Sequence, residues 1–332
     1  MSDPPRLFLP FIFRLVFTMT AASSSSRPRL GFVGLGVMGA PMASHLANAG
    51  YPVALYDVAP QLAQQLALTL PQAQACATPR EVGASSDIVV TMLPNGRVVR
   101  DVVFAEDGLA AGLASGSLLL DTSSAEPWVT RETAARLGER GVAMVDAPVS
   151  GAQWGAQAAE LVFMVGGEKA DVARVAPLLD VMGRATFHLG GLGAGHTMKC
   201  LNNLITALTL TATAEGLAIG THCGLDPAVM TEVLNESTGG SWITRTHIHQ
   251  RVLSRSFDDP FKLELMLKDM GIALDLARAE GLPAMLSGAG QQMWQAAHLA
   301  RGPGVSVSEL VRWVETQMGT EIRSPGSATS AA

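Results

Sequence analysis

Short apolar runs alternate with longer helical stretches from Leu30 to about Gly190. Most of these runs are bounded by Gly, Pro, Asp or Ser, which is typical of buried strands. Strands that alternate with helices predict a parallel sheet wrapped by helices. The predicted strands are Leu30–Val33, Val53–Tyr56, Ile88–Met92, Leu118–Leu120, Ala143–Val145, Val162–Val165 and Thr186–Leu189. Helices fit the gaps, and two of them, Pro41–Ala49 and Pro127–Glu139, end close to a glycine that closes a helix at little cost.

The pattern changes after a cluster of glycines between Gly190 and Gly195, where strand-like runs stop. A helix predicted from Thr197 to about Cys223 is apolar on nearly every side, which indicates burial on several sides. Further helices are predicted at Pro227–Asn235, Phe261–Glu280, Gln291–Ala300 and Val307–Gln317. We therefore expect an α/β domain with a doubly wound, mostly parallel sheet over residues 29–193, and an all-helical domain over 194–319. The long helix joins the two.

Both ends of the chain differ from these domains. An apolar stretch within residues 1–28 is broken by Pro10 and Arg14, so it is too short for a membrane span. Three interpretations of residues 1–28 stay open: an over-extended reading frame with Met19 as the true start, a targeting segment, or a disordered arm. Residues 320–332 are rich in Ser, Ala and Gly and predict a flexible tail.

Composition narrows the possible partners. The 332 residues are 48% hydrophobic and 16% charged, enough for about two folded domains. A net charge of −6 without long Lys/Arg runs argues against nucleic acid, so we expect a small molecule. Three scattered cysteines indicate a reducing, cytoplasmic location. His247 and His249 are too closely spaced to share a helix face, so we interpret them as surface histidines and predict no metal site.

The strongest motif is Gly34-Leu35-Gly36-Val37-Met38-Gly39, which follows the first predicted strand and opens a helix. In this context Gly34 permits a tight turn, Gly36 lets backbone amides approach a pyrophosphate, and Gly39 brings helix and strand together. Val37 and Met38 complete the loop. The dipole of the helix that follows has its positive end at this loop, where it favours a phosphate group. The sequence therefore predicts a dinucleotide site.

Asp57 ends the second predicted strand, where a carboxylate accepts hydrogen bonds from ribose hydroxyls. Its negative charge would repel a 2′-phosphate, and Val58-Ala59-Pro60 supplies no arginine to hold one. We therefore expect NAD in preference to NADP. NADP stays possible, because Arg80 could lie near the place of the 2′-phosphate.

Three loops follow predicted strands, at the sheet edge where open parallel sheets bind ligands. Met92-Leu93-Pro94-Asn95 and Asp121-Thr122-Ser123-Ser124 offer hydroxyls and amides for the nicotinamide end. The loop that begins Ser150-Gly151 could hold a substrate carboxylate with its backbone amides. Ordinary turn chemistry is the alternative for all three loops.

Lys199 stands early in the long apolar helix, with Asn203 four residues on and on the same face. Burial would lower the pKa of the lysine toward the range useful for proton transfer. Asn203 could hold the reacting oxygen. The alternative is a lysine that extends from the helix end to water. Cys200 turns to another face and is interpreted as a buried apolar side chain.

With these residues in view, residues 30–318 resemble the β-hydroxyacid dehydrogenase family, of the 3-hydroxyisobutyrate dehydrogenase type. The stretch from Gly31 to Ala43 matches the extended cofactor signature of that family. Further matches follow in order: Thr91-Met92-Leu93-Pro94, Asp121-Thr122-Ser123-Ser124 up to Pro127, Asp146-Ala147-Pro148-Val149-Ser150-Gly151, Gly193 through Lys199 to Asn203, and Lys268-Asp269.

The resemblance implies an amino-terminal Rossmann domain, a helical domain for substrate binding and dimerisation, and a homodimer or homotetramer with its active site between the domains. It implies NAD-dependent interconversion of a short 3-hydroxyacid and its semialdehyde. It also implies roles by position: Lys199 is the acid–base group; Ser123, Ser150, Gly151, Asn203 and Trp242 contact the carboxylic-acid substrate; Leu93, Pro94, Val98 and Lys268 contact the nicotinamide side, and Ser123 also touches the cofactor.

The sequence departs from the family pattern near the expected substrate. Ala152 and Ala159 stand where many relatives have glycine, Trp154 is large for its loop, and Gly240 replaces a common arginine. Tartronate semialdehyde (2-hydroxy-3-oxopropionate) or another small aldehyde is therefore an alternative substrate. A sulfonate substrate is disfavoured because the arginine that relatives acting on sulfonates place in the loop after the Asp146 strand is missing here. An imine reductase or a non-catalytic dinucleotide-binding protein is disfavoured because Lys199 is present.

Overall fold

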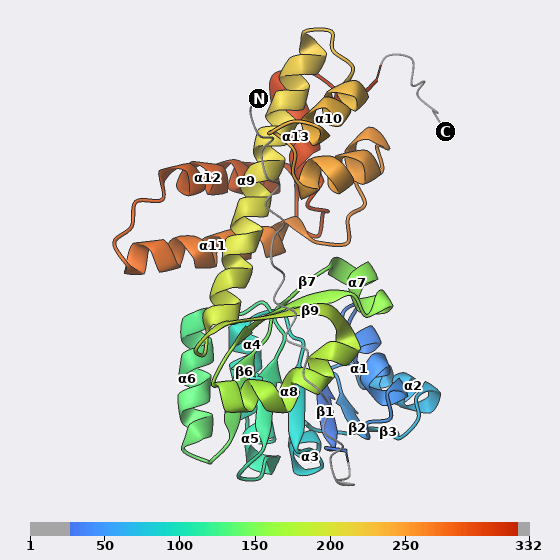
Figure 1. The fold of residues 1–332 in the computed structure, drawn as a ribbon, viewed down its shortest axis with the longest axis vertical. Helices are drawn as coiled ribbons and strands as arrows, with labels where there is room; N and C mark the ends of the chain where they lie inside the picture. The colour runs from blue at the N-terminus through green and yellow to red at the C-terminus, as the bar shows by residue number, and fades with distance from the viewer. Residues whose placement is uncertain (1–26, 325–332) are drawn as a thin grey trace, which may run out of the picture.

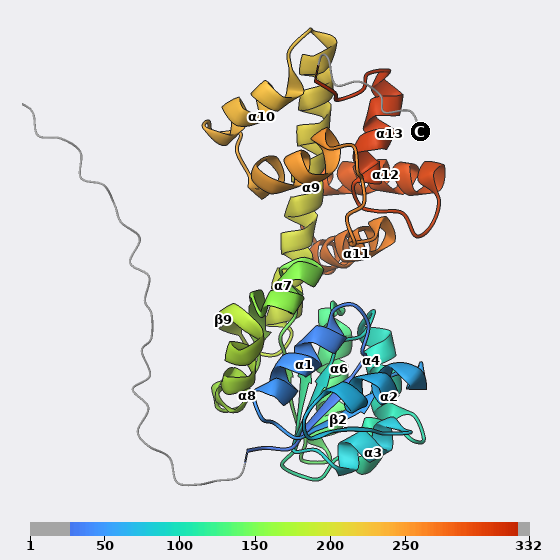
Figure 2. The same ribbon diagram turned by 90° about the vertical axis from the view of Figure 1, so that its right-hand side faces the viewer.

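The computed structural model describes residues 27–324, and its first half is a nine-stranded sheet flanked by helices (Figures 1 and 2). The strand order is β3-β2-β1-β4-β5-β6-β8-β7, and β9 pairs with β8. The first six strands run parallel, whereas β8 is antiparallel to β6 and β7. The strands are β1 Leu30–Val33, β2 Val53–Tyr56, β3 Ala73–Ala75, β4 Ile88–Thr91, β5 Leu118–Asp121, β6 Ala143–Asp146, β7 Val149–Ser150, β8 Leu161–Gly166 and β9 Gly183–Gly190.

Successive strand residues face opposite sides of the sheet and build a separate core on each side. Phe32 and Leu120 belong to one core, while their neighbours Val33 and Leu119 belong to the other. Helices cover both faces, as expected for strands that read as continuous apolar runs. These helices are α1 Gly39–Asn48, α2 Pro60–Thr69, α3 Pro79–Ala84, α4 Gly96–Phe104, α5 Leu109–Gly112, α6 Pro127–Gly138, α7 Ala152–Ala158 and α8 Lys169–Met182.

The second half is helical and is organised around α9, which rises from the sheet through the middle of the other helices (Figure 1). Trp294 is fully buried against it and donates its indole N–H to Thr211 on α9 (2.9 Å). The helices are α9 Ala194–His222, α10 Pro227–Asn235, the π-helix η1 Ile243–Leu253, α11 Leu263–Ala279, α12 Met285–Arg301 and α13 Glu309–Met318. By length and composition α9 could cross a membrane. Its place at the centre of these helices accounts for that apolar character.

The predicted fold class, a mostly parallel α/β domain followed by a helical domain, is confirmed. The prediction missed β3, a short edge strand, and η1, whose sequence has no helical periodicity. The helix α9 was expected to be buried on several sides, and in the single chain one flank of it is exposed. Ile205 and Ile219 are 62% and 55% exposed there.

The predicted domain boundary at residue 193 falls in the turn between β9 and α9. The interpretations of residues 1–28 and of the tail at 320–332 concern mostly positions outside the described residues, namely 1–26 and 325–332. Ile322, however, is fully buried and its N–H donates to Glu315 (2.8 Å). Ordered structure therefore extends past residue 319, where the sequence placed the end of the helical domain.

Candidate functional site

The glycine loop after β1 has the shape that a dinucleotide needs. Gly34 has a φ of +96°, and a Cβ there would lie 2.2 Å from the Met92 carbonyl oxygen. A Cβ on Gly39 would lie 1.8 Å from the Gly34 carbonyl oxygen, so α1 can approach the strand only with glycine at this position. A Cβ on Gly36 would meet nothing within 4 Å, which leaves its backbone open on the ligand side. The loop therefore fits a pyrophosphate at the N-terminus of α1.

Asp57 lies where the ribose of that dinucleotide would bind. It follows β2 directly, and its carboxylate accepts hydrogen bonds from the N–H groups of Leu35 (2.7 Å) and Ala59 (2.9 Å). These bonds fix the carboxylate beside the glycine loop. Each carboxylate oxygen keeps a further lone pair for a ribose hydroxyl.

A recess of about 360 Å³ adjoins Asp57 and is lined by Tyr56, Thr78, Pro79, Val98 and Val102, among others. Its position beside the end of β2 corresponds to the adenosine half of a dinucleotide. Val98, which was predicted on the nicotinamide side with Leu93 and Pro94, lines this recess, and its contact with the cofactor stays a prediction. Arg80 is close by, yet its guanidinium faces Asp107 (3.8 Å), an exposed partner on the rim.

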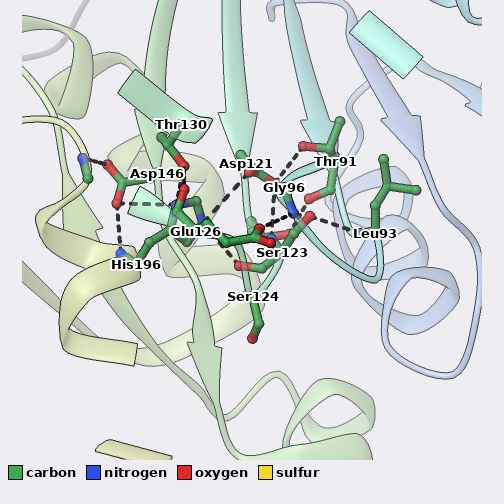
Figure 3. Close-up of polar contacts among 12 residues, drawn as sticks. Thr91, Leu93, Gly96, Asp121, Ser123, Ser124, Glu126, Thr130, Asp146 and His196 are labelled. Carbon is green, nitrogen blue, oxygen red and sulfur yellow. Dashed lines mark hydrogen bonds and ion pairs between the residues drawn. The ribbon is translucent and has the colours of Figure 1, made fainter. Parts of the chain in front are cut away.

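The loops after β4 and β5 lie side by side and are joined through Ser123 (Figure 3). Ser123 is fully buried, and its hydroxyl accepts the N–H of Leu93 (2.9 Å). From the helical domain, the ammonium group of Lys268 donates to the carbonyl oxygens of Pro94 (3.3 Å) and Ser124. A side chain of α11 therefore holds both loops of the cofactor domain.

Lys199, Asn203 and Asp269 form a polar group between α9 and α11. Asn203 donates its amide to Asp269 and accepts a hydrogen bond from Asn202 (3.1 Å), while Lys268 pairs with Asp269 (3.1 Å). Burial lowers the pKa of Lys199 below its ordinary value, and the nearby charge of Lys268 lowers it further, whereas Asp269 opposes the shift. An ammonium group with a lowered pKa gives up its proton at a lower pH than an ordinary lysine does.

Cys200, the next residue, is buried as predicted. Burial raises the pKa of its thiol to about 12. Such a thiol stays protonated and unreactive.

His196 was not singled out from the sequence, although it stands one turn before Lys199 on α9. It is 1% exposed and lies between two buried carboxylates, each 3.7 Å from a ring nitrogen: Asp121 at the end of β5 and Asp146 at the end of β6. Burial raises the pKa of Asp146, and the facing His196 opposes that shift. Figure 3 shows the ring with contacts on both edges.

The backbone is strained in and near the loop after β7, at the two positions where this sequence has alanine and many relatives have glycine. Gly151 has a φ of +130°, and Ala152 and Ala159, at the two ends of α7, have φ values of +52° and +57°. Left-handed backbone costs an L-residue about 1–2 kcal/mol, which explains glycine at such positions. Trp154 between them is 55% exposed.

Trp242 and Ser150 were also predicted to contact the substrate. Trp242 precedes η1 and is 54% exposed, and no hydrogen bond among residues 27–324 links it to Lys199 or Ser123. Ser150 pairs with β8 in the sheet. Their predicted contacts with substrate remain predictions.

The surface interpretation of His247 is wrong. The side chain is 3% exposed, with one ring nitrogen 3.2 Å from the Ser308 hydroxyl and the other 3.5 Å from Asp259. It joins η1 to the start of α13, because an 11-residue π-helix turns this position toward the core. Within the described residues, no three His, Cys, Asp or Glu side chains come together as metal ligands.

A glycine loop for a dinucleotide, with a lysine of lowered pKa at the junction with a helical domain, defines a dehydrogenase that uses NAD or NADP and acts on a hydroxyl group. Comparisons agree. Residues 29–190 match the family model described as the NAD binding domain of 6-phosphogluconate dehydrogenase. Residues 193–314 match the one described as NAD-binding of NADP-dependent 3-hydroxyisobutyrate dehydrogenase. The chain belongs to the β-hydroxyacid dehydrogenase family.

Individual relatives match three quarters or more of this chain. The 2-(hydroxymethyl)glutarate dehydrogenase of Eubacterium barkeri is 34% identical over 89% of this chain and 97% of its own length. A 3-hydroxyisobutyrate dehydrogenase of Pseudomonas aeruginosa is 38% identical over 75% of this chain and 85% of its own length. The solved 3-hydroxyisobutyrate dehydrogenase of Mycobacterium tuberculosis with L-serine is 32% identical, with a TM-score of 0.80 over 87% of this chain and 99% of that one.

Proposed function

We propose that this protein interconverts a short 3-hydroxyacid and its semialdehyde, with NAD as cofactor and Lys199 as the acid–base group. The observation that carries the proposal is the lowered pKa of Lys199, beside Asn203 and Asp269 and next to the helix that holds the cofactor loops. A non-catalytic dinucleotide-binding protein has no need of a lysine in such a place.

Each polar residue has a separate task in this reaction. The neutral amine of Lys199 accepts the hydroxyl proton as the hydroxyl carbon becomes a carbonyl. Asn203 uses one amide hydrogen for Asp269 and keeps the other for the reacting oxygen. The Ser123 oxygen accepts the Leu93 N–H, so its own hydrogen is available to a substrate carboxylate. NAD, when bound, supplies the acceptor for the hydride that leaves the same carbon.

NAD is preferred to NADP because Asp57 stands at the ribose position with its charge beside the place of a 2′-phosphate. Arg80, the nearest candidate to hold that phosphate, faces Asp107 instead. Among substrates, 3-hydroxyisobutyrate comes first on the strength of the named relatives. Tartronate semialdehyde, with glycerate as its reduced form, comes second.

The test is NADH formation with 3-hydroxyisobutyrate, glycerate, L-serine and 3-hydroxypropionate, with NAD and NADP in separate assays. We expect turnover of at least one acid with NAD and a loss of about 10²-fold or more in Lys199→Ala. Titration with NADH, followed by its fluorescence, shows whether the variant still binds cofactor. Activity retained in Lys199→Ala would reject the proposed role of the lysine. A faster reaction with NADP would reject the argument from Asp57.

A further inference from the structure

The imidazole of His196 lies where the ends of β5 and β6 and the helix α6 meet the first turn of α9. Its Nε2 is 3.1 Å from the carbonyl oxygen of Ser123, and its Nδ1 is 2.8 Å from the hydroxyl of Thr130 on α6. Its backbone N–H donates to Asp146 (2.8 Å), which also accepts the N–H of Gly193 (2.7 Å). One residue therefore bonds to the loop after β5, to the last residue of β6 and to α6 (Figure 3).

The carbonyl partner fixes the direction of one of these bonds. A carbonyl oxygen only accepts, so Nε2 carries a hydrogen and donates it to Ser123. The other backbone group of Ser123, its N–H, donates to Asp121 (3.1 Å), and its hydroxyl accepts the Leu93 N–H. Ser123 therefore forms hydrogen bonds through its N–H, its hydroxyl and its carbonyl. The bond to its carbonyl comes from His196 on α9.

The charges around the ring make His196 hard to replace. Asp121 uses one carboxylate oxygen for Thr91 and Ser123, while the other, Oδ2, is buried without a hydrogen-bond partner, 3.7 Å from Nε2 of His196. A buried carboxylate oxygen without a nearby donor or positive charge is costly. The N–H at Nε2 of His196 lies 3.7 Å from this oxygen and places a partial positive charge beside it.

Lys199 follows His196 by three residues, one helical turn, so both side chains lie on the same side of α9. We propose that His196 is a positioning residue: by donating to the Ser123 carbonyl it fixes the distance between the substrate-binding serine and Lys199. The proposal rests on the proposed function, in which Ser123 and Lys199 act on one substrate. Displacements of about 1 Å in such a pair can cost about 10²-fold in rate.

Two variants of similar size separate positioning from packing. His196→Gln keeps an N–H donor that can reach the Ser123 carbonyl, whereas His196→Leu fills the space without one. His188→Leu is the matched control, because His188 also bonds to backbone carbonyls, those of Gly167 (2.9 Å) and Gly190 (3.0 Å), but lies on β9 away from Ser123. Initial rates, the melting temperature and amide hydrogen exchange of residues 121–126 are measured for all three.

We expect kcat of His196→Leu to fall by about 10²-fold with KM for NAD within about twofold of wild type, and His196→Gln to recover at least tenfold of that loss. Hydrogen exchange in residues 121–126 should accelerate in the leucine variant alone, and His188→Leu should keep wild-type kcat. Equal losses in the leucine and glutamine variants, or an unchanged kcat in His196→Leu, would overturn the proposal.

Failure of the proposed function gives a different experimental result from failure of the His196 proposal. If the wild type oxidises none of the acids, that function is rejected, and the exchange measurement decides about His196 by itself. Unchanged exchange of residues 121–126 in His196→Leu then refutes positioning, and faster exchange supports it.

Discussion

At the scale of residues, the reaction proposed for this protein depends on the charges that surround Lys199. Burial lowers its pKa, the positive charge of Lys268 acts in the same direction, and the negative charge of Asp269 acts against both. Oxidation of a hydroxyacid needs the neutral amine, so a lowered pKa makes the reactive form available at lower pH than for an ordinary lysine, whose pKa is about 10.4.

The pH dependence of the reaction follows from that shift. For hydroxyacid oxidation, kcat/KM should rise about tenfold per pH unit in the acidic range and level off at a pH below 10.4. The reverse reaction needs the protonated amine and should become slower as pH rises. In Lys199→Arg, whose guanidinium stays charged, the rising limb should disappear and activity should drop by about 10²-fold or more. Initial rates between about pH 6 and 10 measure this, and a flat wild-type profile contradicts it.

Candidate site residues could be named from the sequence where a motif marks the position by itself. Gly34, Gly39 and Asp57 are such residues, and the structure gives each a local physical reason, whereas the charges that act on Lys199 come from Lys268 and Asp269 on another helix. His196 was missed because its partners, Ser123 and Asp146, are 73 and 50 residues away and meet it only in the folded chain. Trp242 lies immediately before η1, and its contact with substrate stays a prediction.

Ala152 and Ala159 show a sequence signal whose physical meaning appeared only with the backbone. Their departure from glycine suggested a reshaped pocket, and the structure adds left-handed φ values at both ends of α7. The loop that carries Ser150 and Gly151 is thus strained on the side where substrate is expected.

At the scale of elements, α11 links the two domains through one side chain. Lys268 donates to the carbonyl oxygens of Pro94 and Ser124 and pairs with Asp269. Hydrogen bonds from a charged donor contribute about 1.5–3 kcal/mol each, and these hold the loops of the predicted nicotinamide side against the helical domain.

Lys268→Met removes those bonds while keeping the length of the side chain. KM for NAD should rise about tenfold or more, since at least 1.4 kcal/mol of loop positioning is lost. The pH at which oxidation levels off should also move upward, because the positive charge of Lys268 lowers the pKa of Lys199. Arg278→Met on the same helix is the control: Arg278 pairs with Asp275 at the surface, so its loss should change neither quantity. Equal kinetics in both variants would show that Lys268 does not hold the loops.

Elements with strong periodicity were predicted, and those shaped by tertiary contacts were not. The apolar runs of β1, β4 and β5 are buried throughout, so their strands were evident from composition. In contrast, α12 begins at Met285, six residues before the predicted start, in a stretch where Met285 and Leu286 are 84% and 73% exposed. Exposed apolar residues give no amphipathic pattern from which a helix can be predicted.

At the scale of the whole molecule, one flank of α9 exposes apolar side chains that the single chain leaves uncovered. Met198, Leu201 and Ile205 recur at helical spacing on one side and are 36%, 38% and 62% exposed. Soluble monomers seldom leave a continuous apolar stripe of this kind in water. We propose that a second copy of the chain covers it, which gives the homodimer or homotetramer expected from the family resemblance and places the interface one turn from Lys199.

Light scattering coupled to size exclusion tests this assembly. The wild type should have the mass of two or four chains at micromolar concentration, and Ile205→Glu should shift it to one chain, because a charge buried in an apolar interface lacks a partner. Leu68→Glu on α2, where Leu68 is 88% exposed on the cofactor domain, should leave the mass unchanged. Because the stripe begins beside Lys199, Ile205→Glu should also lower kcat while NADH binding stays intact. A wild-type monomer, or an Ile205→Glu variant that keeps the wild-type mass, would show that this flank is not the interface.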